Sequence, residues 1–112
     1  MIEEVLISYL NSLDLSAIVY MEQPKVKPEA FFVVEKTGGG VTNHINESTI
    51  AIQSYGKSLY QAASMNEEIK QAMSETVFLD EIASVQINSD YNYTDDNAKQ
   101  YRYQAVFVIT HY

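Results

Sequence analysis

The chain has 112 residues, 46% of them hydrophobic and 12% aromatic, so we expect one domain with one core over residues 1–112. Its net charge of −8 and seven scattered Lys and Arg exclude a broad phosphate-binding surface, so neither nucleic acid nor an anionic membrane is an expected partner. It contains no cysteine for a disulfide or thiolate chemistry, no apolar run near the ~20 residues of a membrane span, and an acidic start unlike a signal peptide. A soluble protein made in a cytosol is the expectation.

The first elements expected in chain order are a helix and a short strand. Apolar residues from Ile2 to Leu13 recur at spacings of three and four, and Glu3 and Glu4 suit the positive end of a helix dipole. Ala17 to Met21 is short and apolar, which favours a strand. The two prolines that follow, Pro24 and Pro28, indicate a loop.

Three of the four glycines are consecutive and lie between two apolar runs. Phe31 to Lys36 and Thr49 to Tyr55 read as strands, and Thr37 to His44 lies between them. Because glycine loses the most conformational entropy on folding, a triplet is costly unless a loop must bend, approach another backbone or move. We expect a hairpin with a flexible glycine loop at its tip.

The second half predicts a helix and two more strands. Ser58 and Gln61 have the capping-box spacing, and an apolar stripe follows as far as Met73. Alternating apolar residues predict strands from Ile82 to Ser89 and from Tyr101 to His111, joined by a polar turn through Asp90 to Gln100.

These elements predict an α+β fold in the order α-β-β-β-α-β-β. The economical arrangement is a single, mostly antiparallel five-stranded sheet, with a mixed sheet left open, and both helices packed on one face. No internal repeat is present.

Motifs for catalysis or ligand binding are weak. Ala51 to Ser58, which ends in Gly56-Lys57-Ser58, fits a relaxed phosphate-loop pattern, but its residues alternate like a strand and Ser58 suits a helix cap. The polar residues from Asp90 to Asp96 lack the glycine and glutamate of a calcium loop. Neither His44 nor His111 has a partner at zinc-ligand spacing, and no Gly-x-Ser-x-Gly turn exists. We therefore expect no catalytic, cofactor or metal residues, and not an enzyme.

The order of several segments resembles the tail terminator family of long-tailed bacteriophages and prophages, also called tail completion or head-tail joining proteins. The resemblance spans roughly Glu22 to Thr110 and no single motif is diagnostic. It rests on the following segments in order: Glu35-Lys36-Thr37-Gly38-Gly39-Gly40, Asn43-His44, Ala51-Ile52-Gln53-Ser54-Tyr55, the helix Ser58 to Met73, Asp90-Tyr91-Asn92-Tyr93-Thr94-Asp95 and Tyr101-Arg102-Tyr103-Gln104.

The resemblance implies a structural virion protein at the head-tail junction, assembled in the bacterial cytoplasm. Such a subunit forms a hexameric ring that caps the tail tube at its final length and gives the head a surface to dock on. Its implied partners are further copies of itself, the major tail tube protein and a head-completion or connector protein, and phage DNA would pass through the ring. No cofactor is implied.

Two segments and one arginine are the candidate assembly residues on this hypothesis. The glycine loop and the last hairpin turn would order against a neighbour, and Arg102 would form an ion pair between subunits or on the sheet surface. Tyrosines are enriched at protein interfaces, although packing between strands is an equal explanation for those near the last hairpin. The candidates are Thr37, Gly38, Gly39, Gly40, Asn43, His44, Asp90, Tyr91, Tyr93, Asp95, Asp96 and Arg102.

Two other functions stay open from the sequence. One is a different component of the phage neck or tail, such as a head-completion adaptor or a minor tail protein. The other, from a different class, is a small nucleotide-binding domain that uses Gly56, Lys57 and Ser58.

Overall fold

A computed structural model describes every residue from Met1 to Tyr112. Its elements, in chain order, are α1 (Ile2–Ser12), β1 (Val19–Tyr20), β2 (Phe31–Thr42), β3 (Ile45–Gly56), α2 (Leu59–Ser74), the short 3-10 helix η1 (Thr76–Phe78), β4 (Ile82–Asn92) and β5 (Tyr101–His111).

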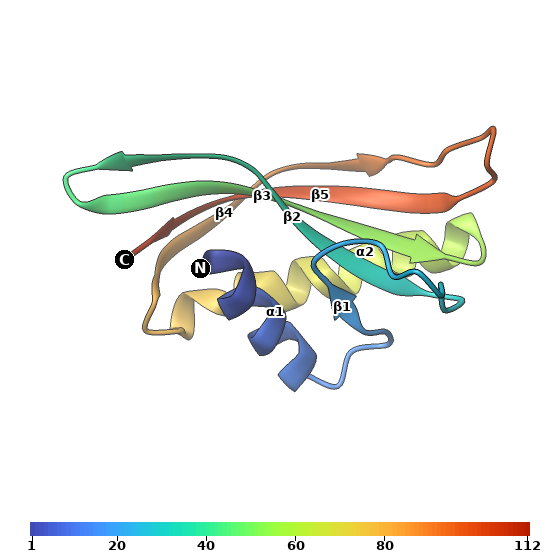
Figure 1. The fold of residues 1–112 in the computed structure, drawn as a ribbon, viewed down its shortest axis with the longest axis horizontal. Coiled ribbons are helices and arrows are strands. Elements are labelled where there is room, and N and C mark those ends of the chain that lie inside the picture. The colour runs from blue at the N-terminus through green and yellow to red at the C-terminus, as the bar shows by residue number, and fades with distance from the viewer.

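The five strands form one mixed sheet in the order β1-β2-β3-β5-β4. The short β1 is parallel to β2, and every other neighbouring pair is antiparallel. Both α1 and α2 lie on the same side of this sheet (Figure 1). The predicted fold class, element order and helix placement are therefore confirmed.

The core lies between the two helices and one face of the sheet. Leu6 and Leu10 from α1 and Ile69 and Met73 from α2 are fully buried there against every second residue of the central strands. Those strand residues are Phe32, Val34, Ile50, Ile52, Ala105, Phe107 and Ile109. Because strand side chains alternate between faces, the opposite face carries the residues in between. We call that opposite face, which no helix covers, the open face.

Helix α2 begins where its capping residues predict. The backbone N–H of Gln61 donates to Ser58 Oγ at 3.1 Å, and the Gln61 side-chain oxygen accepts from the backbone N–H of Lys57 at 2.7 Å. The first bond satisfies an amide donor that the first turn of a helix leaves free, and the second ties the residue before the cap to that turn. Neither α-helix combines the length and apolar character that crossing a bilayer requires.

Strand β1 is shorter than the predicted span of Ala17 to Met21. The Asn11 side chain of α1 bonds both backbone groups of Val19, donating to its carbonyl at 3.0 Å and accepting from its N–H at 2.9 Å. The side chain thus occupies the outer edge of β1 as a neighbouring strand would. As a result, β1 contributes only two residues, which cover Phe32 and Val33 of β2.

Strands β2, β3 and β4 are longer than predicted, whereas β5 spans Tyr101–His111 as predicted, and the long strands make the molecule elongated. Its principal extents are 44 × 26 × 24 Å. The β2-β3 hairpin projects past the helical layer at one end of the sheet, while the β4-β5 connection rises away from α2 at the other (Figure 1). The helices therefore cover the middle of the sheet and leave its two ends bare.

Candidate assembly surfaces

The glycine triplet does not form a loop, which corrects the prediction for Thr37 to His44. Gly38, Gly39 and Gly40 are extended in β2 and pair with Thr49, Ser48 and Glu47 of β3. The turn consists of Asn43 and His44 alone, whose φ angles of 51° and 66° suit a two-residue hairpin. The sequence reading failed because it placed the backbone reversal at the glycines, whereas asparagine also tolerates the left-handed region.

One of these glycines is favoured by close approach rather than by backbone conformation. No glycine has a positive φ. A Cβ on Gly39 would lie 3.1 Å from the backbone oxygen of Glu47 and 3.0 Å from Cε of Lys36, whereas one on Gly40 would meet nothing within 4 Å. Thr37 is the extra residue of a β-bulge between Lys36 and Gly38. We call β2 from Gly38, the turn and β3 as far as Glu47 the glycine arm.

The loop at the other end of the sheet is folded by its own side chains. Asn92 Oδ1 accepts from the backbone N–H of Thr94 at 3.0 Å, and Asp95 Oδ1 accepts from those of Asn97 and Ala98. A backbone bridge joins Asp95 to Gln100, and Asp96 is exposed. No group of three acidic or histidine side chains in the chain converges in a way that could hold a metal ion.

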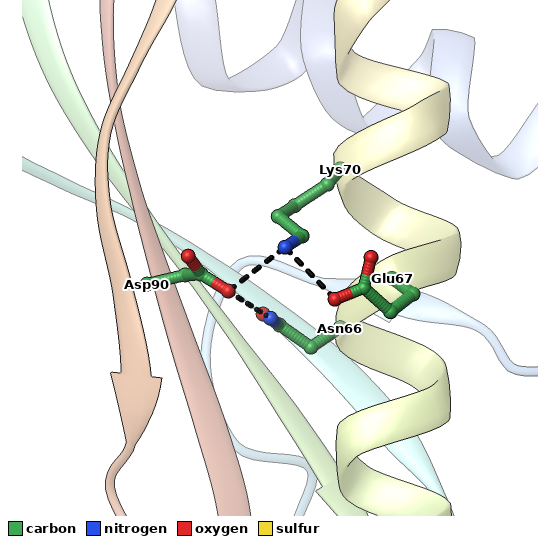
Figure 2. A network of polar contacts seen from close by, with 4 residues as sticks. All are labelled: Asn66, Glu67, Lys70 and Asp90. Carbon is green, nitrogen blue, oxygen red and sulfur yellow. Dashed lines mark hydrogen bonds and ion pairs between the residues drawn. The ribbon is translucent and has the colours of Figure 1, made fainter.

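Asp90 is a strand residue that faces α2, which corrects its placement in the hairpin turn. Its Oδ2 accepts from Asn66 Nδ2 and from Lys70 Nζ, each at 2.9 Å (Figure 2). Lys70 also pairs with Glu67 at 2.9 Å. The hydrogen bond from Lys70 holds the pKa of Asp90 below its ordinary value of 3.8, and bonds to Glu67 and Asp90 raise the pKa of Lys70. Asp90 therefore ties β4 to α2.

Arg102 makes no ion pair within the chain, so its predicted ion pair on the sheet surface is absent. Its guanidinium carbon lies 4.5 Å from the ring centre of Tyr93, its Nε donates to the Tyr93 carbonyl at 2.7 Å, and its Nη1 donates to Tyr55 Oη at 3.2 Å. Gln23 also donates to Tyr55 Oη, at 3.0 Å. The arginine thus fixes the start of the last loop to the open face.

A shallow hollow of about 560 Å³ lies on the open face beside Arg102. Thr37, Tyr93 and Arg102 all line it, so the structure brings these three predicted candidates together. The three glycines, Asn43 and His44 lie in the glycine arm, Asp95 and Asp96 lie in the opposite loop, and Asp90 lies in β4 against α2. Tyr91 accepts from Gln104 beside the hollow without lining it.

Sequence reasoning missed the glutamines of this hollow. Gln53 Nε2 donates to Gln104 Oε1 at 2.6 Å across neighbouring strands. Both residues alternate with core residues, Gln53 with Ile52 and Gln104 with Ala105, and the register pairs them directly. Two amides at matching positions of adjacent strands were a signal that the open face is polar and ordered.

Two residue pairs that resemble chemical motifs have structural roles. Ser48 Oγ lies 2.8 Å from His111 Nε2, but Ser48 is only 1% exposed, and burial lowers the pKa of the histidine. Lys57, in the phosphate-loop pattern, pairs with Glu29 at 3.4 Å while Ser58 caps α2. Neither arrangement leaves a free nucleophile or a cradle of converging amides.

Comparison with known proteins assigns no function to these surfaces. No protein-family model matches the chain, and no curated protein matches its sequence.

Proposed function

We propose that this chain is a structural subunit of a bacteriophage tail, a tail terminator that assembles as a hexameric ring. The ring would cap the completed tail tube by occluding its growing end, and its other face would receive the head through a connector protein. No bond is made or broken, so the function needs interfaces rather than catalytic groups. The site of action would be the head-tail junction of the virion.

The observation that carries this proposal is the pair of free, unlike edges on the sheet. Strand β2 is open from Glu35 to Thr42, and β4 has no neighbour on its outer side. Such a pair suits a cyclic ring, because each subunit of a ring meets its neighbours through two different surfaces. The elongated sheet and the resemblance described from the sequence support the same reading.

Deletion of the gene in its phage or prophage tests the proposal. We expect tails of uncontrolled length, or tails without heads, and restoration of normal particles when the gene is supplied from a plasmid. Normal tail lengths and normal infectious particles in the deletion strain would reject the proposal. Tails of correct length that fail only to join heads would favour a neck adaptor, and a position away from the major tail protein gene would point the same way.

A further inference from the structure

Much of each free edge of the sheet lacks the charges and prolines that natural edge strands carry, although a β-bulge interrupts each edge and Glu35, Lys36 and Asp90 lie on them. From Thr37 to Asn46 and from Ile82 to Ser89 there is no Asp, Glu, Lys, Arg or Pro, although 20% of the chain is charged. Edge strands usually carry lysine, proline or inward charges, which prevent pairing with other chains. In a chain of net charge −8, these edges are also where two copies repel least.

The outward peptide groups of β2 follow from the hydrogen bonds of the ladder. The N–H of Phe32 donates to Ile18, away from β3, at 3.0 Å. In an antiparallel ladder the outward groups belong to every second residue, so Val34 and then Lys36 face outward before the bulge. The bulge at Thr37 adds one residue, and the outward residues beyond it are Gly39 and Val41.

The same reasoning gives the outward groups of β4. The N–H of Tyr93 donates inward to Arg102 at 2.8 Å, which makes Asp90 an outward residue. A bulge between Ile87 and Ser89 then shifts the alternation, so Ile87 and Val85 follow. In β2, the outward residues after Lys36 come three and then two positions later along the chain. In β4, the outward residues before Asp90 come three and then two positions earlier.

We infer that β2 of one copy pairs with β4 of a second copy, with Lys36 opposite Asp90, Gly39 opposite Ile87 and Val41 opposite Val85. Strands β2 and β4 run antiparallel within the sheet, so a second copy placed beside the first in the same orientation presents β4 antiparallel to β2. In this register the two bulges face each other and the ladder continues through them. The helical layers of both copies then lie on the same side.

The side chains in this register are complementary. Lys36 meets a carboxylate whose hydrogen bonds to Asn66 and Lys70 both use Oδ2, which leaves Oδ1 for it. Gly39 places no side chain of its own opposite Ile87, which is 51% exposed. Val41, 69% exposed, comes beside a groove of about 350 Å³ whose lining combines Val85, Ile87 and Phe107 with Lys70 and Ser74. The exposed side chains of Val41 and Ile87 thus each gain an apolar or glycine neighbour.

This contact gives the proposed ring a specific interface between subunits. Only the closure of the ring rests on the proposed function. Because the two edges differ, the contact is heterologous and repeats from copy to copy until the ring closes. Strand β1 sets one limit of the ladder, since it covers β2 at Phe32 and Val33.

Engineered cysteines test the register, since the chain contains none of its own. Gly40 and Gln86 would form a non-hydrogen-bonded pair, with Cα atoms about 4.5 Å apart, within the range that a disulfide spans. Gly40 has room for a side chain, and Gln86 is exposed. Under mild oxidation over a range of concentrations, the double variant Gly40→Cys/Gln86→Cys should give a ladder of covalent oligomers, and each single variant should stay monomeric.

Matched variants make the result specific. Gly40→Cys/Ser89→Cys is out of register and should cross-link at less than a tenth of the rate. Val41→Lys added to the in-register pair should abolish the ladder, while Val26→Lys, at an 89% exposed position outside both edges, should not. Absence of a ladder, equal dimer formation by Gly40→Cys alone, or equal cross-linking out of register would overturn the inference. A ladder with normal tails in the gene deletion would instead reject only the tail function.

Discussion

At the scale of single residues, Asp90 shows how a tertiary partner changes the role of a side chain. Among Tyr91, Asn92 and Thr94 it reads as part of a polar turn, yet it accepts hydrogen bonds from Asn66 and Lys70 of α2. Asn66 is only 1% exposed, so its amide depends on Asp90 for a hydrogen bond. No local pattern indicates a contact across 24 residues of chain, and for this reason the sequence could not assign it.

We expect Asp90→Ala to destabilise the fold more than Lys70→Ala. Alanine at position 90 leaves a buried amide donor unpaired, which costs about 1 to 3 kcal/mol, whereas loss of an exposed ion pair costs about 1 kcal/mol or less. Urea unfolding of both variants and of the double variant gives the two costs and their coupling. Equal costs for both single variants would show that the Asn66 amide finds another partner.

The same carboxylate predicts a pH dependence of stability. Its pKa is lowered in the folded chain, so ionised Asp90 stabilises the fold above its ordinary pKa of 3.8. This contribution is lost as the pH falls through the lower folded-state pKa. The free energy of unfolding should therefore drop more steeply with acid in the wild type than in Asp90→Asn, as measured by urea unfolding between neutral pH and pH 3. Parallel curves for the two proteins would contradict the assignment.

At the scale of elements, the glycine arm shows where sequence patterns lose their meaning. The alternation that marks strands needs side chains, and three glycines supply none. The prediction therefore ended β2 too early, at Lys36, and began β3 too late, at Thr49. Helix α2 was predicted well because its cap and its apolar stripe lie in adjacent residues. No local sequence pattern predicts the bulge at Thr37.

Alanine substitution separates the glycines of the arm. In Gly40→Ala the new methyl group meets nothing, so the loss of freedom in the unfolded chain should raise the free energy of unfolding by about 0.4 to 1 kcal/mol. In Gly39→Ala the methyl group approaches the Glu47 carbonyl at 3.1 Å, so the free energy of unfolding should fall. Thermal unfolding by circular dichroism would rank the variants. The opposite order would mean that the arm shifts easily to relieve the contact.

At the scale of the whole molecule, the fold class was predictable and the shape was not. The order of helices and strands and the burial of one sheet face follow from periodicity, and the structure confirms both. The 44 Å length comes with long strands, three register shifts and a two-residue turn, which depend on pairing between distant segments. Of the candidate site, Thr37, Tyr93 and Arg102 line one hollow because the open face joins β2, β5 and the last loop, and the Tyr91 ring meets the edge or face of the Tyr93 ring with the ring centres 5.9 Å apart.

The uneven cover of the sheet predicts uneven local stability. The centre is buried under both helices, whereas the glycine arm lies beyond them and buries few apolar contacts. Such segments open without global unfolding, so arm amides in the monomer should exchange with solvent at least about a hundredfold faster than those of Ile50 to Ile52. Hydrogen exchange with mass spectrometry measures this, and equal rates would show that the arm opens only with the whole domain.

If β2 pairs with β4 of a neighbour, the peptide containing Gly39 and Val41 should become protected in the cross-linked oligomer, because only there do their outward N–H groups have acceptors.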